Sequence, residues 1–227
     1  KEITRVSLPG PNRGMVKKIF IDSSGKLWIA SEGYRAFIYE PDNGEFQQYF
    51  DEKEEHPILI YSNSQLFSIL EDDQHRIWTG TLGSGINMYD PETKAGVNHH
   101  FDPQNDKSLA DNFVRSLMKD SNGRIWIFTF KGVNRHVPNA KSIVHLKSDK
   151  QGEIFFQFFP TSGMQDNNGH IWMSTFGGGI LKFDPGNMEF EVFQKEQAPF
   201  EDLFSNNVFN LEQDKAGNIW IASGLAA

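Results

Sequence analysis

The sequence contains no cysteine among its 227 residues. This absence excludes disulfide bridges, thiolate metal ligands and cysteine nucleophiles together. The seven histidines show no metal-ligand spacing, so we expect no metal, and nothing in the sequence calls for another cofactor. No Ser-His-Asp constellation and no paired general acid and base stand out, so no catalytic residue is predicted.

Long runs of one chemical character are also missing. No apolar stretch approaches the roughly 20 residues that a membrane-spanning helix needs, and no signal peptide is visible at Lys1. There is no run of lysine and arginine, and the formal net charge is −8. Because a phosphate backbone is bound through clustered cations, we do not expect this segment to bind nucleic acid.

The sequence does contain a plain internal repeat, marked by tryptophan. Successive tryptophans are 50, 48, 46 and 48 residues apart, at Trp28, Trp78, Trp126, Trp172 and Trp220. Each follows an aspartate by six residues, at Asp22, Asp72, Asp120, Asp166 and Asp214. A glycine stands three residues before the tryptophan in four repeats, and His75 takes that place in the second. A fixed period of this length is typical of stacked structural repeats.

The aspartate and glycine predict a tight hairpin in every repeat. Aspartate accepts hydrogen bonds from the backbone just ahead of it, and glycine tolerates a positive φ angle. The tryptophan then lies on the second strand of the hairpin, where a pleated surface suits an aromatic ring. Because it recurs in every repeat, we interpret it as a core residue, not as a sugar-stacking platform.

Each repeat has room for four short strands. In the third repeat these are expected at Phe113–Lys119, Ile125–Thr129, Val133–Val137 and Ile143–Leu146. Short strands at regular spacing, without a helical period, indicate an all-β fold. The sequence therefore predicts a β-propeller of four-stranded antiparallel blades. As one domain over 1–227, its complete blades are expected at 15–50, 65–101, 113–146 and 159–194, with partial blades at 1–8 and 207–227.

Two arrangements of these blades follow from the partial repeats at both ends. In the first, which we favour, the chain is a fragment of a larger propeller. In the second, Ile3–Leu8 completes the last blade as its outer strand and closes a five-bladed ring. Either arrangement lets neighbouring blades cover the apolar faces that one blade cannot bury alone.

The repeat closely resembles the two-component regulator propeller repeat. The fifth repeat carries the first half of that pattern as Asn206, Val208, Leu211, Asp214, Gly217, Ile219 and Trp220. The fourth repeat carries the second half as Ile171, Trp172, Thr175, Gly177, Gly178, Gly179, Ile180, Asp184 and Pro185. The resemblance covers essentially the whole chain.

This resemblance implies the periplasmic sensor region of a hybrid two-component histidine kinase, anchored in the inner membrane. Such a region detects oligosaccharides released from a polysaccharide and is itself not an enzyme. The implied partners are an oligosaccharide and the remaining propeller and signalling domains of the parent chain, and a homodimer is compatible with this role. Two alternatives stay open: a propeller enzyme, such as a lyase or glycosidase, or a protein-interaction scaffold.

Several repeats depart from the pattern. His75 replaces the turn glycine, so the hairpin of the second repeat is expected to be strained or longer. Lys131 and Gly132 stand where other repeats have two glycines, and Pro160 and Gly163 interrupt an otherwise apolar first strand. Such breaks mark either specialised positions or neutral drift.

The candidate ligand-binding residues lie in loops that open on one face of a propeller. These are the loops between the second and third strands and the loops between blades. Sugars need aromatic surfaces for their C–H faces and planar polar groups for their hydroxyls. The residues that fit are Tyr34, Arg35, Asn112, Arg115, Phe130, Lys131 and Phe176. The alternative is that each is an ordinary exposed loop residue. The glycine turns at Gly83 and Gly177 do not open a helix, so they are a weak signal for a phosphate site.

Overall fold

The computed structural model describes residues 16–31, 37–48, 65–136, 143–146, 159–196 and 198–224. These residues form strands and connecting turns only. Within the described ranges there is no helix, and so none that could cross a membrane. The all-β prediction is therefore confirmed.

Within the described ranges, eighteen strands follow one another in four sets of four and a final pair. The first two sets are β1 (Val16–Ile21), β2 (Leu27–Ser31), β3 (Phe37–Glu40), β4 (Glu45–Gln48), β5 (Leu66–Glu71), β6 (Ile77–Thr81), β7 (Ile86–Asp90) and β8 (Ala95–His99). The others are β9 (Val114–Lys119), β10 (Ile125–Thr129), β11 (Gly132–His136), β12 (Ile143–His145), β13 (Phe159–Gln165), β14 (Ile171–Phe176), β15 (Ile180–Asp184), β16 (Glu189–Phe193), β17 (Val208–Gln213) and β18 (Ile219–Ser223).

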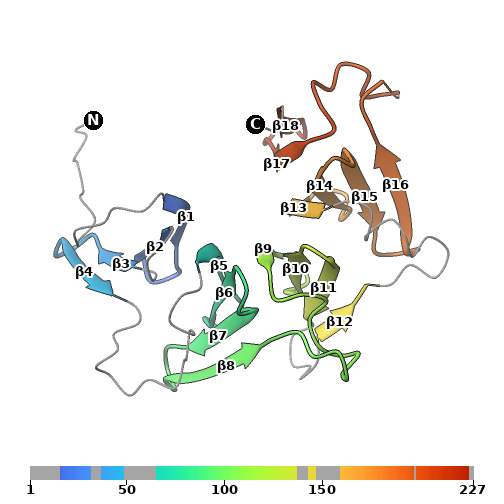
Figure 1. The fold of residues 1–227 in the computed structure, drawn as a ribbon. Coiled ribbons are helices and arrows are strands. Elements are labelled where there is room, and N and C mark those ends of the chain that lie inside the picture. The colour runs from blue at the N-terminus through green and yellow to red at the C-terminus, as the bar shows by residue number, and fades with distance from the viewer. Residues whose placement is uncertain are drawn as a thin grey trace.

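Each set forms an antiparallel sheet in which every strand pairs with the next one in sequence. The first strands of neighbouring sheets pack on one another, β1 on β5, β5 on β9, β9 on β13 and β13 on β17. Figure 1 shows the sheets as blades arranged in an arc, with these first strands innermost. The predicted β-propeller of four-stranded antiparallel blades is confirmed.

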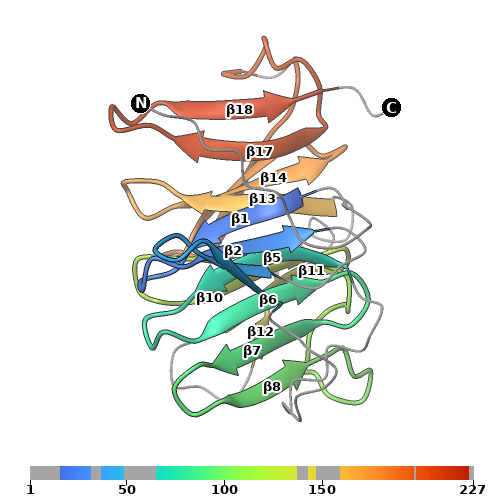
Figure 2. The ribbon, with the colours of Figure 1, turned by 90° about the vertical axis from the view of Figure 1, so that its left-hand side faces the viewer.

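The strand directions give the propeller two distinct faces. In Figure 2, β13 and β17 run one way while β14 and β18 run the other. The first strands therefore begin, and the second strands end, on one face, which we call the mouth face. The hairpins that join first and second strands lie on the opposite face, which we call the hairpin face.

The described residues form an open arc, with β1 and β17 at its two ends (Figure 1). At the second end, β17 and β18 form a sheet of two strands. Ile3–Leu8, which would close a five-bladed ring, lies outside the described ranges. Both the fragment and the closed ring therefore stay predictions.

The aspartate of each repeat organises its hairpin as expected. Oδ1 of Asp120 accepts hydrogen bonds from the amides of Asn122 and Arg124, both 3.0 Å long. Oδ2 of the same carboxylate accepts the indole Nε1–H of Trp126. The indole bond, which was not predicted, recurs in all five repeats at 2.7 to 3.0 Å. It ties the start of the hairpin to the second strand.

Four of the five tryptophans are core residues, as predicted. Trp28, Trp78, Trp126 and Trp172 are at most 9% exposed, whereas Trp220 is 65% exposed. Trp220 lies on β18, which pairs only with β17 among the described residues. A neighbouring strand and a following blade cover the other indoles, as Phe183 of the next blade does for Trp126.

The hairpin with His75 is strained but not longer than the others. His75 has a φ of 60°, in the left-handed region that non-glycine residues seldom occupy. Its amide donates to the Asp72 carbonyl at 3.1 Å, just as the Gly123 amide donates to the Asp120 carbonyl at 2.9 Å. Histidine is one of the few residues that tolerate this conformation, so the turn keeps its length.

The departure at Gly163 has a packing explanation. A Cβ atom at Gly163 would collide with the ring of Phe128 on the preceding blade. The residue two after the tryptophan is small in the other repeats, at Ala30, Gly80, Ser174 and Ala222, but is Phe128 in the third. Gly163 on β13 therefore leaves space for Phe128, which is the one large side chain among these equivalent positions.

Candidate functional site

Every first strand carries a β-bulge close to the mouth face. In β9, Ser116 pairs with Phe128 and Val114 pairs with Thr129, so Arg115 is left without a partner in the ladder. The same register shift occurs in the other four first strands. The skipped positions, which we call the bulge residues, are Lys17, Phe67, Arg115, Thr161 and Phe209. A bulge bends its strand and re-aims one side chain.

Two of the bulge residues, Lys17 and Thr161, contact the first strand of the next blade. Lys17 Nζ lies 5.5 Å from the ring centroid of Phe67. Thr161 Oγ1 donates to the Val208 carbonyl at 2.8 Å. Because the first strands are innermost, the bulges place one side chain per blade around the inner edge of the arc. This set contains two cations and two phenyl rings, and no carboxylate.

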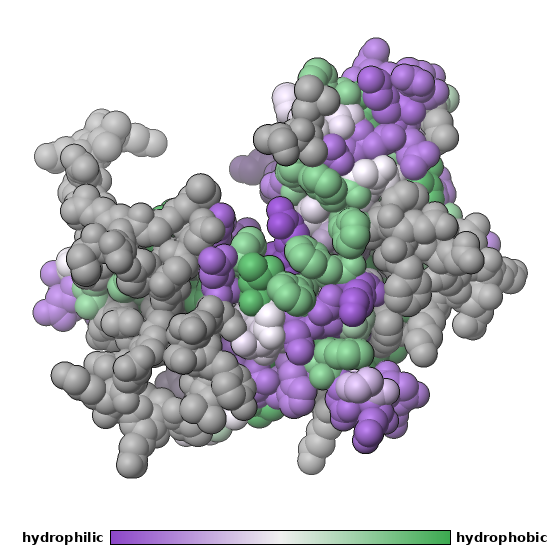
Figure 3. Space-filling model, viewed as in Figure 1, coloured by the Kyte–Doolittle hydropathy of each residue, from purple (hydrophilic) through white to green (hydrophobic). Residues whose placement is uncertain are grey.

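Four phenylalanines form a continuous surface beside these residues, which we call the aromatic shelf. Phe113 and Phe130 stack with parallel rings 5.6 Å apart, and Phe159 meets Phe130 edge-on at 6.1 Å. Phe176 pairs with Phe159 across β13 and β14, which places the two side chains on the same side of the sheet. Phe113, Phe159 and Phe176 are 40 to 50% exposed. Figure 3 shows hydrophobic side chains gathered near the centre of this view.

A lysine borders the shelf. Lys131 follows Phe130 in the turn after β10, and its Nζ lies 5.9 Å from the ring centroid of Phe101. Phe101 is itself partly exposed and comes from the connection between the second and third blades. A cation and a further aromatic ring therefore lie together at this border of the shelf.

The structure brings three of the predicted site residues together: Phe130 and Phe176 belong to the aromatic shelf, and Lys131 borders it. Arg115 is the half-buried bulge residue of the same blade as Phe130. Tyr34 and Arg35 lie outside the described residues. Their assignment as ligand-binding residues stays a prediction, as does that of the other five.

Asn112 is placed on the mouth face but is already engaged by the fold. Its Oδ1 accepts the Phe101 amide at 2.6 Å, and its backbone carbonyl accepts the amides of Gly83 and Gly85. Asn206 repeats this arrangement, since its Oδ1 accepts the Lys195 amide at 2.6 Å. This recurring asparagine therefore has a structural role. Because the Gly83 and Gly85 amides donate to the Asn112 carbonyl, they are not available to bind a phosphate.

Sequence reasoning missed Phe113 and Phe159 as site residues, and it missed Lys17 and Phe67. Phe113 was assigned to the first strand, whereas it forms an isolated bridge to Leu82 just before β9 begins. The two phenylalanines are 46 residues apart, the same interval as Trp126 and Trp172. Phe113 and Phe159 therefore occupy equivalent positions in consecutive repeats, and this could have identified them from the sequence. The bulges, by contrast, leave no mark in the residue pattern.

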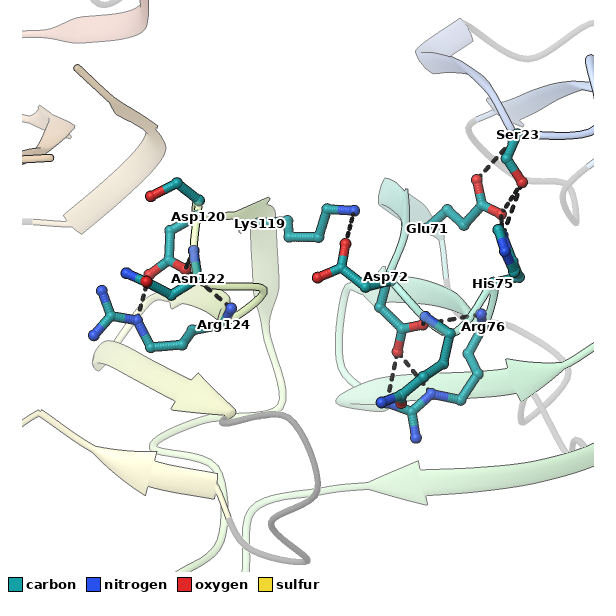
Figure 4. A network of polar contacts seen from close by, with 12 residues as sticks. Ser23, Glu71, Asp72, His75, Arg76, Lys119, Asp120, Asn122 and Arg124 are labelled. Atoms are coloured by element: carbon teal, nitrogen blue, oxygen red, sulfur yellow. Dashed lines mark hydrogen bonds and ion pairs between the residues drawn. The ribbon is translucent and has the colours of Figure 1, made fainter. Parts of the chain in front are cut away.

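On the hairpin face, each blade is fastened to the one before it by the residue preceding its aspartate. Glu71 accepts the Ser23 amide, Gln165 the Ser121 amide and Gln213 the Asn167 amide, at 2.7, 2.7 and 2.9 Å. Lys119 instead donates to Asp73 at 2.7 Å. Figure 4 shows the contacts of Glu71 and Lys119. We call these contacts the inter-blade clasps.

The first clasp brings a serine, a histidine and a carboxylate together, but not as a catalytic relay. Ser23 Oγ and Glu71 Oε1 each lie 2.9 Å from the same ring nitrogen, Nδ1 of His75 (Figure 4). A nucleophilic triad instead needs the serine and the acid on opposite ring nitrogens. The arrangement is a clasp and gives no support to the enzyme alternative. Within the described ranges, no three His, Asp or Glu side chains are grouped to hold a metal ion.

Together, the stacked four-stranded blades and their bulged inner strands define a β-propeller whose mouth face carries an aromatic and cationic surface. The family model described as two component regulator propeller matches residues 108–131 and 202–224. The predicted resemblance to that repeat family is confirmed.

The chain is also similar to individual proteins. Histidine kinase P4 of Formosa agariphila is 29% identical over 200 residues, which cover 87% of this chain and 14% of that protein. The extracellular domain of the hybrid two component system BT3049 from B. thetaiotaomicron has a TM-score of 0.75 at 21% identity, covering 93% of this chain and 28% of that one. This chain therefore spans only a small part of either relative.

A propeller of different function is similar as well. Virginiamycin B lyase from Staphylococcus aureus, solved with quinupristin, has a TM-score of 0.68 at 14% identity, covering 95% of this chain and 65% of that one. Identities this low establish the shared fold and nothing further about function.

Proposed function

We propose that this chain is a ligand-sensing propeller segment of a hybrid two-component sensor histidine kinase, and that its ligand is an oligosaccharide. The segment lies in the periplasm, and its parent protein is anchored in the inner membrane. The aromatic shelf on the mouth face is the observation that carries this proposal. It combines the predicted Phe130 and Phe176 with the exposed rings of Phe113 and Phe159.

The chemistry of the shelf suits a sugar. Exposed phenyl rings in a continuous group mark an interaction surface, because a soluble protein seldom leaves such a patch to water without a use. Sugar rings present C–H faces that pack on phenyl rings, while their hydroxyls need polar partners at the rim. Arg115 and Lys131 provide hydrogen-bond donors at that rim.

Signalling requires that the ligand bind two states of the protein unequally. The shelf is built from residues of two neighbouring blades, Phe113 and Phe130 on one side and Phe159 and Phe176 on the other. A ligand that spans it favours one relative position of those blades. The parent protein then relays this preference across the membrane to its kinase modules.

Isothermal titration calorimetry tests the proposal on the extracellular region of the parent chain, with a panel of oligosaccharides of known composition. Phe130→Ala removes the ring that contacts both Phe113 and Phe159, so the affinity should fall by about tenfold, the effect of losing one well-packed aromatic contact. Val144→Ala on the outer strand β12 is the control and should bind as the natural protein does. Turnover of an oligosaccharide, or no binding of any, would contradict the proposal.

The protein-interaction scaffold remains a second candidate, because an exposed apolar patch also fits a protein partner. The two are separated by the same shelf variant. If Phe130→Ala leaves all glycan binding intact but abolishes binding of another protein, the scaffold is favoured.

A further inference from the structure

We propose that the oligosaccharide recognised at the mouth face carries negative charge, as carboxylate or sulfate groups, and that Arg115, Lys131 and Lys17 recognise it. This inference deepens the proposed function and rests on it. It assigns a chemical class to the ligand and a specificity role to three side chains.

The first observation is the distribution of charge. The chain carries 30 acidic and 22 basic residues, so a set of positions chosen without regard to function would favour carboxylates. The five bulge residues instead comprise a lysine, an arginine, two phenylalanines and a threonine. Both charged residues among these five described positions are therefore cationic, opposite in sign to the net charge of the chain.

The second observation is that two of these cations lie over aromatic rings. Lys131 Nζ is 5.9 Å from the Phe101 ring centroid, and Lys17 Nζ is 5.5 Å from the Phe67 ring centroid. Arg115 follows Phe113 of the shelf by two residues in the sequence. Because Lys131 directly follows Phe130, a sugar ring resting on the shelf has a cation at its border.

The third observation concerns Asp111, an acidic residue close to the shelf in the sequence. Asp111 is only 8% exposed, and its Oδ1 accepts the Phe113 amide at 3.3 Å. Its carboxylate is turned into the fold and supports the shelf from behind. It does not present negative charge to a ligand on the exposed rings.

Arg115 is the residue that discriminates most strongly. A guanidinium has a planar fork of donors that matches a carboxylate or a sulfate with two parallel hydrogen bonds. Arg115 is half-buried at its bulge, which fixes the side chain better than an exposed loop does. Partial burial also strengthens its attraction for an anion, because water screens the charges less.

Calorimetry on the extracellular region of the parent chain tests the inference with matched ligands. The probes are tetramers of uronic acids, each measured beside its carboxyl-reduced neutral form and a sulfated version of that neutral form. At least one anionic probe should bind about tenfold or more tightly than its neutral partner, as one charge-assisted contact implies. Its affinity should fall between about 0.05 M and 0.5 M salt, because screening weakens the attraction.

Variants assign the effect to Arg115. Arg115→Gln should lose about tenfold in affinity for the anionic probe and clearly less for the neutral probe, because glutamine keeps a hydrogen-bond donor for hydroxyls but not the charge. Arg115→Lys keeps the charge and should recover part of the loss. Lys215→Gln, in an exposed turn on the hairpin face, is the control cation and should have no effect. Circular dichroism and thermal unfolding establish that each variant is folded.

The outcomes separate this inference from the function on which it rests. Tight binding of neutral oligosaccharides, with no preference for their anionic forms and no effect of Arg115→Gln, would overturn the charge specificity and leave the sensor proposal standing. Binding of no oligosaccharide at all would contradict both. A preference for the carboxylate over the sulfate form, or the reverse, would identify the anionic group.

Discussion

The indole Nε1 of Trp126 donates a 2.7 Å hydrogen bond to Oδ2 of Asp120, and both side chains are buried. The same carboxylate also accepts the Arg124 guanidinium and two backbone amides of the hairpin. One aspartate therefore fixes the turn, the second strand and a core indole at once. Four further repeats use the same arrangement.

Removal of this carboxylate should destabilise the propeller. Asp120→Ala leaves the Trp126 N–H and two turn amides without their partner, so we expect a loss of about 2–4 kcal/mol in the free energy of unfolding. Asp214→Ala is the matched control, because the Asp214 to Trp220 bond is exposed and water can replace it. Guanidinium unfolding of both variants measures the difference. Equal losses would show that burial of the bond does not matter.

The packing of Phe128 against Gly163 predicts a compensating pair of substitutions. Phe128→Ala should cost about 3–5 kcal/mol, because it removes a fully buried ring and leaves a cavity. Gly163→Leu alone should be at least as harmful, since a side chain there collides with the Phe128 ring. The double variant has a small residue at position 128 and a large one at position 163. The second and third blades have the same combination at the equivalent positions, Gly80 and Leu117.

Urea unfolding of the two single variants and the double variant measures this coupling. The double variant should be more stable than either single one. If the two losses simply add, Gly163 is not there to accommodate Phe128.

The clasp at His75 should also show coupling. In the fourth repeat, Gln165 Nε2 donates to the Gly169 carbonyl, while in the second repeat Glu71 accepts from His75 instead. Glu71→Gln or His75→Gly alone removes the contact between the Glu71 carboxylate and the His75 ring. The double variant places a glutamine and a turn glycine at these positions, as Gln165 and Gly169 are placed in the fourth repeat. We expect a coupling free energy of about 0.5–2 kcal/mol in a double-mutant cycle. Strict additivity would contradict this explanation of the missing turn glycine.

The stability of the propeller should fall in mild acid because of His99. Burial, with His136 and His100 nearby, lowers the pKa of His99 to about 4, and its ring stacks on Trp78. An unfolded histidine titrates near pH 6.5, so below that pH the unfolded state binds a proton that the folded state does not. Stability is therefore full above about pH 6.5 and is lost progressively toward pH 4.

The expected loss between pH 7 and 5 is on the order of 2 kcal/mol. His99→Phe keeps a ring beside Trp78 without the titration, so its stability should vary less over this range. Titration of the hairpin carboxylate Asp72 does not contribute to the stability change between pH 7 and 5. Burial raises the pKa of Asp72, but hydrogen bonds from Arg76 and Trp78 outweigh it and lower the pKa overall. Its contribution is therefore lost as the pH falls below about 5, through the usual carboxylate range and on toward the lowered folded-state pKa.

Much of the fold could be predicted from the sequence because its signals are local. The spacing from Asp120 to Trp126 spans one hairpin, and the predicted second strand Ile125–Thr129 matches β10. Even His75 keeps the length of its turn. Short-range hydrogen bonding of this kind depends on neighbours that the sequence displays directly.

The rest depends on contacts between blades. The match of Phe128 to Gly163, and of Glu71 to His75 and Ser23, becomes visible only when it is known which side chains face each other. The aromatic shelf is a similar case, since Phe130 was predicted but its partners Phe113 and Phe159 were not. The structural bond of Asn112 to the Phe101 amide likewise leaves no trace in the sequence, and its assignment to a ligand stays a prediction.

The most direct test is a crystal structure of the extracellular region of the parent chain with a bound oligosaccharide. The proposed function predicts density for a sugar ring against Phe113 and Phe130, with Arg115 in contact with its substituents. Density for the same sugar on the hairpin face, with the mouth face bare, would contradict it.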